Sequence, residues 1–427
     1  MRSGHRQPLP SIPGAAMNCP MTPTLTVIHT SDWHLGHELH GHSREDEHDA
    51  FLDWLLQQIA EVGADVLLIT GDIYDVANPP IAAMRRLFTF LNAATQQRSD
   101  LQIVIIGGNH DSAGRIDLPA ALLGDGNIRF VGALPRHGGV PDIDALLIPL
   151  NGSGGETAAL LAAIPFCRPG DLGQHSLASL YAKVAEHGVA AANGQPLLLT
   201  GHLHVAGGEV SELSERRIVV GGQEAEAASL FDPRAAFVAL GHLHRPQTIN
   251  AAMPVRYAGS PFPLSATERS YRHSLTVVEF FGNKASWREV PIPRPAPFIA
   301  VPSDGAAPLK DVIAELEALV IDPDIPPGKR PFLEVSVAVD GPDPHLHAQV
   351  LAAIADKAVR LTRIRQVRPG NAASAVDVLA GDDLDELLPA EVFAAAYRKA
   401  HPGTQMPSNL AQAFEELLVA LNSAEEA

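Results

Sequence analysis

Short apolar runs alternate with helical patterns in the first third of the chain. Four runs have the length and apolarity of buried strands: residues 25–30, 66–70, 103–106 and 128–131. Apolar residues recur every three to four positions over residues 51–62, which predicts a helix with Ser43 as its N-cap and Gly63 at its end. Pro79 and Pro80 open a second predicted helix. This alternation indicates an α/β layer structure.

Strand-like patterns dominate the chain from there to about residue 290. Four more strands are expected, over residues 197–200, 237–240, 255–258 and 275–280. A helical pattern covers residues 177–186, whereas the glycine-rich stretch around Gly152 predicts a loop. The first domain is therefore expected to span residues 24–290, with βαβ units early and β-rich sequence later.

A proline-rich linker predicts a domain boundary near residue 291. Proline occupies every second position from Pro291 to Pro297. Beyond it, helical and strand patterns alternate over residues 309–319, 332–339, 345–358 and 359–367. We predict a small α+β domain over residues 298–369, and a third segment over residues 370–427 with amphipathic helices at 390–400 and 410–421.

Composition and charge narrow the class of protein. Of 427 residues, 46% are hydrophobic and 19% charged, which excludes a disordered or fibrous chain. A net charge of −18 excludes a non-specific nucleic-acid coat. DNA binding by such a chain would need metal ions, a local basic face or a basic partner. Cys19 and Cys167 are the only cysteines, which excludes a disulfide scaffold and suits a reducing compartment.

The first 23 residues are expected to form a disordered leader. They are rich in proline and lack the apolar stretch of a secretory signal, and the true start could be Met17 or Met21. No apolar run in the chain approaches the length that spans a bilayer. We therefore expect a cytoplasmic protein.

Residues that can bind metal follow five of the predicted strands. They are Asp32 and His34, then Asp72, then Asn109, His110 and Asp111, then His202 and His204, and finally His242 and His244. Ligands of open α/β sheets bind beyond the carboxyl ends of the strands. The five loops are therefore expected to converge on one site.

The donors are carboxylates, imidazoles and one amide, with no sulfur. This set suits Mn²⁺, Fe²⁺ or Zn²⁺, and it is too large for one ion. Two ions roughly 3.5–4 Å apart and bridged by one carboxylate would use it, and would activate water against a phosphate. His110 is outside the ligand count and could protonate the leaving alkoxide.

Each motif alone also has a structural explanation. An Asp-x-His or Gly-Asn-His-Asp sequence after a strand can be only a turn or a cap. We favour His202 as a ligand and leave His204 as a supporting residue. Solvated surface is the expected place of four further histidines: His37, His40, His42 and His48.

Four motifs resemble a known superfamily. They are SDWHLG at residues 31–36, GDIYD at 71–75, GNHDS at 108–112 and YAGSP at 257–261. The pattern resembles the calcineurin-like metallophosphoesterases and, among these, the DNA-repair branch of SbcD subunits of bacterial SbcCD nucleases. The resemblance covers about residues 25–281. It implies a two-layered β-sandwich flanked by helices, a small α+β capping domain and C-terminal helices.

The resemblance also implies roles for single residues. One Mn²⁺ would be held by Asp32, His34 and His244, a second by Asn109, His202 and His242, with Asp72 bridging the two. His110 would contact the scissile phosphate and assist the leaving group, and Asp111 would orient His110. Arg115 is a candidate phosphate contact, with a surface salt bridge as the alternative. Mg²⁺, Fe²⁺ or Zn²⁺ could replace Mn²⁺.

Partners follow from the same resemblance. The capping domain would help to hold DNA through Arg360, Arg363 and Arg365, for which a solvated strand edge is the alternative explanation. The C-terminal helices would dock on an SbcC-like coiled-coil ABC-type ATPase, or close the chain's own fold. The expected assembly is a homodimer within a heterotetramer on double-stranded and hairpin DNA, associated with the nucleoid.

The implied activity is that of a Mn²⁺-dependent nuclease. With SbcC it would be an ATP-dependent 3′–5′ exonuclease on double strands and an endonuclease on single strands and hairpins, in DNA repair and recombination. One alternative is a phosphoesterase for a nucleotide, lipid or protein phosphate. Another is a catalytically silent scaffold for an ATPase, against which the complete ligand set argues.

Overall fold

The computed structural model describes residues 23–368 except 125, 212–224 and 342, and eight single residues beyond them: 393, 397, 401, 406, 407, 410, 413 and 414. Contacts divide the chain into two units, residues 1–367 and 368–427. The predicted leader and most of the predicted C-terminal segment lie outside the described residues. Within the described part, every helix is too short or too polar to cross a bilayer.

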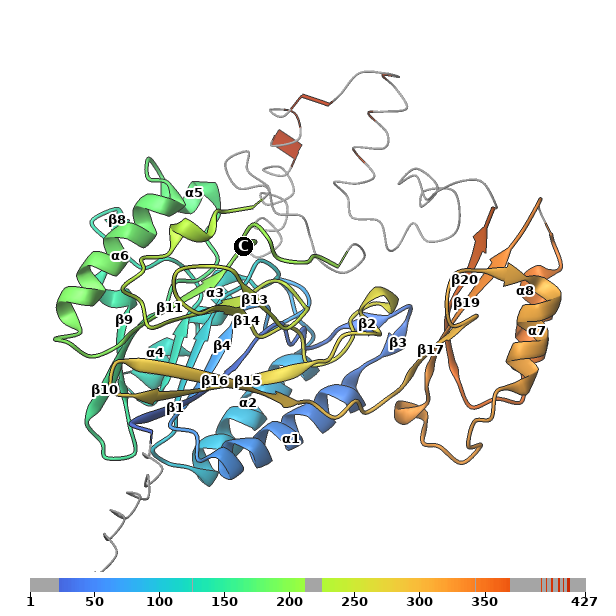
Figure 1. Ribbon diagram of the computed structural model, residues 1–427, viewed down its shortest axis with the longest axis horizontal. Helices are drawn as coiled ribbons and strands as arrows, with labels where there is room; N and C mark the ends of the chain where they lie inside the picture. The colour runs from blue at the N-terminus through green and yellow to red at the C-terminus, as the bar shows by residue number, and fades with distance from the viewer. Residues whose placement is uncertain are drawn as a thin grey trace, which may run out of the picture. The chain divides into compact units, whose positions relative to one another are not determined.

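The first sheet of the larger unit is mainly parallel (Figure 1). Four strands run parallel in the order of the chain: β1 (Leu25–Thr30), β4 (Val66–Thr70), β5 (Gln102–Ile106) and β6 (Ile128–Val131). Antiparallel β15 (Ser274–Phe281) and β16 (Lys284–Pro291) extend it beside β1. Helices α1 (Glu45–Val62) and α2 (Ile81–Gln97) bury their apolar residues against one face. All four strands predicted for this region are confirmed.

The second sheet packs on the other face of the first. Its order is β13 (Gln247–Ile249), β14 (Val255–Tyr257), β12 (Phe237–Gly241), β11 (Leu197–His202), β10 (Thr157–Ala162) and β9 (Leu147–Asn151). One apolar core joins the facing sides of both sheets and the helix α6 (Leu177–Ala191). This arrangement confirms the predicted sandwich flanked by helices.

One local prediction was incomplete and one was wrong. The loop predicted around Gly152 is present as a turn, but the antiparallel strands that it joins, β9 and β10, were not predicted. Helix α1 begins at Glu45 with Arg44 in the N-cap position. The Arg44 guanidinium bonds to both carboxylate oxygens of Glu47, at 2.5 and 2.8 Å, and so fixes this first turn without Ser43 as its cap.

A smaller sheet follows residue 297 and is called the capping sheet below. Its strands β17 (Phe298–Val301), β18 (Ala307–Pro308) and β20 (Arg360–Val367) all pair in parallel with β19 (Phe332–Ala338). Helices α7 (Leu309–Ala318) and α8 (Leu346–Ala353) cover one face and share an apolar core with it. The predicted helix at 345–358 therefore ends five residues early. A bulge in β20 after Leu361 places Arg363 and Arg365 on the opposite face.

One aromatic ring joins the capping sheet to the first domain. Phe332 is fully buried, and the guanidinium carbons of Arg360 and Arg44 lie 3.6 and 4.9 Å from its ring centre. Arg44 also donates to the carbonyl oxygen of Pro263 at 2.7 Å. Cations over an aromatic face are attracted by its quadrupole, and more strongly when desolvated. The contact thus binds β19 and β20 to the start of α1.

The smaller unit contains a stacked aromatic pair. The rings of Phe393 and Phe414, both helical residues, lie 4.1 Å apart and nearly parallel. Each comes from one of the two predicted C-terminal helices. Val392, Leu417 and Leu418, which we expected on the same apolar faces, lie outside the described residues.

Several histidines are buried in the larger unit. His48, which we expected at the surface, is fully buried on α1 and donates to the carbonyl oxygen of Trp33 at 3.0 Å. His29 lies between the two sheets, with Nε2 2.9 Å from the Thr70 hydroxyl. Burial lowers the pKa of each of the two to about 3. Both rings are therefore neutral in the folded protein at neutral pH.

These buried rings predict acid sensitivity. Below pH 6.5 the unfolded chain protonates both histidines and the folded chain does not, so stability is complete above that pH and falls as the pH drops towards 3. Each histidine should remove about 1.4 kcal/mol of unfolding free energy per pH unit. Urea unfolding in the presence of EDTA measures the unfolding free energy between pH 7 and 5. In His29→Gln the slope of this free energy against pH should be smaller by the equivalent of one proton. An unchanged slope would contradict this.

Candidate metal centre

The carboxyl ends of five strands meet at one edge of the sandwich. Parallel strands β1, β4 and β5 deliver the first three predicted motifs, and parallel strands β11 and β12 deliver the histidine pairs. Strand β4 contacts both β11 and β12 across the sandwich. The predicted convergence of the five loops is therefore what the structure shows.

Aspartates and histidines form three overlapping groups at this edge. In each group the candidate ligand atoms lie within 4.8 Å of one another. The groups are Asp32 with His34 and His244, Asp32 with Asp72 and His202, and His34 with Asp72 and His110. The first is the set expected around one ion. Asp72 belongs to the other two, which is the placement that a bridging carboxylate requires.

The remaining expected ligands gather around the amide of Asn109. Its Oδ1 lies 2.9 Å from Nε2 of His202 and 3.1 Å from Nδ1 of His242. Asp72 is adjacent, since its Oδ2 lies 3.3 Å from Nε2 of His202 and 3.7 Å from Nε2 of His34. The seven predicted ligands thus lie in one cluster, in which only Asn109 is partly exposed.

The donor atoms fit divalent metal ions. Nε2 of His34 is buried and makes no hydrogen bond to the described residues, although a buried polar nitrogen ordinarily has a partner. It faces Asp72 within a set of oxygen and nitrogen donors that lacks sulfur. The arrangement is compatible with a site for two metals.

Backbone strain concentrates in the same residues. Asp32, His34, Asp72 and His242 have φ of 53°, 46°, 48° and 101°, in the left-handed region that residues with a Cβ rarely adopt. Such residues cost about 1–3 kcal/mol each and persist where the surroundings hold them. Here the N–H groups of Asp32 and His34 bond to the carbonyl oxygens of Gly71 and Asp72, at 3.1 and 3.0 Å.

Glycine is required where the loops pass one another. A Cβ at Gly108 would collide with the backbone nitrogen and the carboxylate of Asp72. A Cβ at Gly241 would collide with the Thr70 carbonyl and the Ser31 side chain. The packing of the loops after β4 and β5 therefore depends on Gly108, and the close approach of the two sheets depends on Gly241.

Three histidines are oriented by a hydrogen bond from Nδ1. His202 donates to the carbonyl oxygen of Thr70 at 2.9 Å, and His34 to Oδ1 of Asp75 at 3.2 Å. His244 donates to Oε1 of Glu268 at 2.8 Å. Each bond fixes the ring and allows Nε2 to serve the cluster, as is usual for histidines that bind metal.

Two of these supporting carboxylates were not predicted. Glu268 is fully buried, and its second oxygen accepts the N–H of Leu264 at 2.8 Å. It lies 24 positions after His244 in a region without a local motif. Asp75 was in view as the end of the GDIYD motif, and its position three residues after Asp72 was the available signal.

His110 and Asp111 have different surroundings from those expected. Nδ1 of the His110 ring lies 2.7 Å from the main-chain oxygen of Asp75. The backbone N–H of His110 bonds to Oδ1 of Asp72 at 2.8 Å. The carboxylate of Asp111 accepts the N–H groups of Tyr74, Ile73 and Gly108 at 3.0, 3.1 and 2.9 Å. Asp111 therefore fixes the backbone of two loops, and the expectation that it orients the His110 ring was wrong.

Electrostatics favour a positive charge in the cluster. Burial raises the pKa of Asp32. Burial acts on Asp72 in the same sense, but His202, His110 and His34 outweigh it and hold the pKa of Asp72 well below its usual range. Burial lowers the pKa of His202, yet Asp72 and Asp32 raise it to about 9. A proton on His202 or a metal ion can supply the charge, so the two compete.

His204 lies beside the cluster. Its ring centre is 6.4 Å from that of His242, and none of the three groups of candidate ligands contains it. This placement agrees with the expected supporting role of His204 and with His202 as the nearer residue to Asp72.

The predicted DNA-contacting arginines divide into buried and exposed residues. Arg360 is buried, stacks on Phe332 and donates to the carbonyl oxygen of Arg330 at 2.9 Å. The expectation that it contacts DNA was wrong, because its guanidinium is used inside the protein. Arg115 is half-buried on the short helix α3 (Ala113–Asp117), which follows His110, and Arg363 is half-buried on β20. Their DNA contacts stay predictions.

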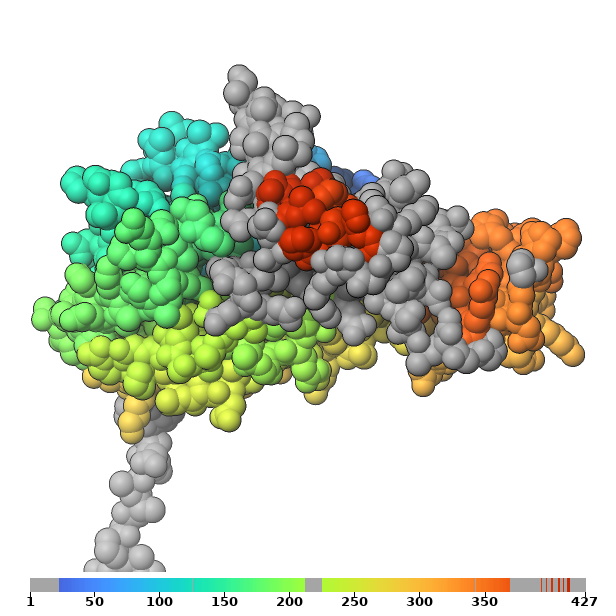
Figure 2. Space-filling view, turned by 90° about the horizontal axis from the view of Figure 1, so that it is seen from above, coloured from blue at the N-terminus to red at the C-terminus, as the bar shows by residue number. Residues whose placement is uncertain are grey.

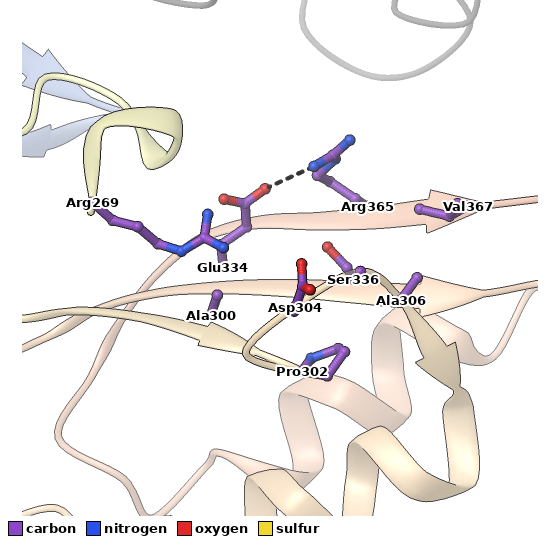
Figure 3. A pocket seen from close by; sticks show the side chains of 10 residues that line it. Arg269, Ala300, Pro302, Asp304, Ala306, Glu334, Ser336, Arg365 and Val367 are labelled. Atoms are coloured by element: carbon purple, nitrogen blue, oxygen red, sulfur yellow. Dashed lines mark ion pairs between the residues drawn. The ribbon is translucent and has the colours of Figure 1, made fainter. Parts of the chain in front are cut away.

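Arg365 lines a pocket on the capping sheet (Figure 3). The pocket measures about 290 Å³ and lies on the face opposite α7 and α8. Arg365 pairs with Glu334 at 3.6 Å, and Arg269 reaches in from the first domain and donates to the carbonyl oxygen of Ser303 at 3.3 Å. Asp304 also lines it, so the arginines are balanced by carboxylates. The lining includes no predicted metal ligand.

Two family models match this chain. A family model described as calcineurin-like phosphoesterase matches residues 25–246, and one described as type 5 capsule protein repressor C-terminal domain matches residues 294–401. A dimetal phosphatase from Danio rerio is similar in structure, with a TM-score of 0.38 at 10% identity, over 64% of this chain and 98% of that one. The fold and the clustered aspartates and histidines define a calcineurin-like phosphoesterase, a metal-dependent phosphodiester hydrolase.

Sequence relatives narrow the class. The chain is 38% identical over 387 residues to the SbcD subunit of the nuclease SbcCD from Rhodobacter capsulatus, which covers 87% of this chain and 94% of the relative. It is 31% identical over 318 residues to the protein of the same name from Escherichia coli strain K12. This match covers 69% of this chain and 74% of the relative. The chain belongs to the family of SbcD subunits of SbcCD nucleases, as the motifs predicted.

The bond from His244 to Glu268 predicts a role in metal affinity. Glu268→Gln keeps the shape of the side chain but removes the charged acceptor, so the ring is held less firmly. Divalent metal should bind roughly 10–100-fold more weakly in calorimetric titration with Mn²⁺. Glu279→Gln, on β15, is the matched control and should bind as the unaltered chain does. Equal affinity of both variants would refute the role of Glu268.

Proposed function

We propose that this chain is a Mn²⁺-dependent DNA nuclease subunit that acts with an SbcC-like ATPase. The observation that carries the proposal is the cluster of seven donors, all buried except the partly exposed Asn109, at the ends of five strands in a member of the SbcD family. A scaffold without activity would not need four strained residues in that cluster. With its partner, the nuclease would act on double-strand ends and on hairpins.

Two sets of residues in the cluster would each hold one metal ion. Asp32, His34 and His244 would hold one ion and Asn109, His202 and His242 the other, with Asp72 shared. When bound, two metals activate a water molecule and neutralise charge on the phosphate.

His110 would be the group that transfers a proton. Its Nδ1 donates to the carbonyl oxygen of Asp75, so Nε2 is the atom that can serve the substrate. The protonated ring would deliver the Nε2 proton to the departing alkoxide. Its ring centre lies 4.7 Å from that of His34, and this proximity supports the proposed role.

The chain as a whole is negatively charged, so DNA binding requires positive charge from another source. The net charge of −18 repels a polyanion, so metal ions and a basic partner must offset it. The relatives are named as SbcD subunits of the nuclease SbcCD, and the name denotes one part of a two-component nuclease. We therefore assign the coiled-coil ATPase SbcC as the partner that holds DNA near the site, with Arg363 and Arg365 as further contacts.

An exposed apolar surface supports a homodimer. Leu122 is 92% exposed on α4 (Ala120–Leu123), and Leu118, just before it, is 73% exposed. The turquoise segment that contains them lies at the surface (Figure 2). Ile81 at the start of α2 is 71% exposed. A contiguous apolar patch on a surface marks a protein–protein contact, whereas single exposed apolar residues are common. We propose that a second copy of the chain covers them.

The dimer predicts the effect of a charge at this surface. Leu122→Asp should place a charge where apolar contact is needed and convert the dimer to a monomer, with the thermal transition unchanged because the residue is exposed. Size-exclusion chromatography with light scattering measures the mass. Val320→Asp, at a 96% exposed position of the capping domain, is the control. A monomeric unaltered chain, or a dimeric Leu122→Asp variant, would refute the interface.

Nuclease activity is the direct test of the proposed function. Cleavage of hairpin, duplex and single-stranded DNA should require Mn²⁺, disappear with EDTA and, for duplex ends, depend on SbcC and ATP. His110→Gln should lower the rate roughly 10²–10⁴-fold by loss of the proton donor while Mn²⁺ still binds. His187→Gln, an exposed histidine on α6, is the matched control. Intact DNA in the full complex, with turnover of a small phosphodiester alone, would favour the small-substrate alternative.

A further inference from the structure

An aromatic residue that no motif contains lies next to the metal cluster. Phe166 follows β10, whose carboxyl end lies at the same edge as those of β11 and β12 because the three strands are parallel. Its ring centre is 6.3 Å from that of His202, with the rings nearly perpendicular at 87°. The ring therefore flanks a residue whose Nε2 is part of the cluster.

The backbone of Phe166 is hydrogen-bonded to the loop that carries Asn109. Its N–H bonds to the carbonyl oxygen of Gly107 at 2.9 Å, two residues before Asn109. The next charged residue, Arg168, begins the short helix α5 (Pro169–Leu172), and its N–H bonds to Oδ2 of Asp171 at 2.7 Å. The segment is thus bonded to the loop of Asn109 at Phe166, and Arg168 caps the helix that follows.

Phe166 and Arg168 together present a partly exposed face. Phe166 remains partly exposed, unlike the core aromatics Phe237 and Phe280, which are fully buried. Arg168 is exposed, and its guanidinium carbon lies 5.7 Å from the Phe166 ring centre. A ring and a cation side by side are the elements with which proteins bind single-stranded nucleic acid, one stacking on a base and the other pairing with a phosphate.

We propose that Phe166 and Arg168 form a nucleotide-binding lip of the active site. The base next to the scissile phosphate stacks on Phe166, and Arg168 pairs with a neighbouring phosphate. Stacking needs an unpaired base, so the lip selects frayed ends, hairpin loops and single strands over intact duplex. The inference rests on the proposed nuclease function and names the part of the chain that recognises the nucleotide.

A purely structural role for Phe166 would have different consequences. If the ring only supports His202, its loss would weaken metal binding and slow the hydrolysis of every phosphodiester alike. If the ring stacks on a base, its loss would leave metal affinity intact and affect only substrates that carry a base at that position. A diester without a nucleobase, methyl p-nitrophenyl phosphate, separates the two.

The test combines Phe166→Leu with an abasic substrate. The full chain would cleave a labelled single-stranded oligonucleotide with Mn²⁺, with and without one abasic site beside a mapped cleavage position. The abasic site should slow the unaltered chain at that position roughly tenfold, and Phe166→Leu should slow cleavage of the normal oligonucleotide by a similar factor. Phe166→Leu should be insensitive to the abasic site, and Phe166→Tyr should behave as the unaltered chain.

Arg168 has its own readout. Arg168→Gln should reduce the slope of log affinity against log salt by roughly 0.7 for single-stranded DNA, as expected for one lost phosphate contact. Glu186→Gln, an exposed residue on α6, is a control for surface charge.

The outcomes separate the lip from the activity on which it rests. An unaltered chain that cleaves no DNA even with SbcC and ATP would overturn the nuclease function. Cleavage by the unaltered chain with independent, multiplying losses from Phe166→Leu and the abasic site would overturn only the lip. So would equal losses on methyl p-nitrophenyl phosphate, weaker Mn²⁺ binding by Phe166→Leu, or an unchanged salt slope for Arg168→Gln.

Discussion

The carboxylate of Asp72 lies where the two sheets of the sandwich meet, and the rest of the site is arranged around it. A buried carboxylate requires opposite charge and hydrogen bonds, because removal from water is costly. Asp72 finds both in the N–H of His110 from the first sheet and in His202 from the second. The same two requirements bring the remaining donors together. A cation bound among these donors would therefore stabilise this edge of the sandwich.

The site shows which residues can be found in a sequence and which cannot. The clustering of the seven candidate ligands could be predicted because each follows a strand in a short motif, and parallel strands end at one edge. Glu268 could not, since only the folded chain brings it to His244. Asp111 was found, but its task was not, because its partners are backbone N–H groups that carry no sequence signal.

The fold repeats this distinction between local and long-range information. Buried strands such as β4 and β5 were evident as apolar runs, whereas β9 and β10 were hidden by the glycines of their turn. Arg360 belongs to a basic stretch in the sequence, yet its neighbour across space is Phe332, which turns it from a surface cation into a buried one. His48 was likewise misplaced because its acceptor, the Trp33 carbonyl, belongs to another loop.

The ring of Phe332 between Arg44 and Arg360 has a consequence for cooperativity. Separating the capping sheet from α1 would hydrate a fully buried ring and leave the Arg44–Glu47 pair beside an open hydrophobic surface. The same helix carries His48, which holds Trp33 between Asp32 and His34. The two sheets of the catalytic sandwich and the capping sheet should then melt in a single transition. A chain truncated before residue 298 would lack the capping sheet and would therefore unfold at a lower temperature. The surface at the start of α1 that Phe332 covers would be exposed and could promote aggregation.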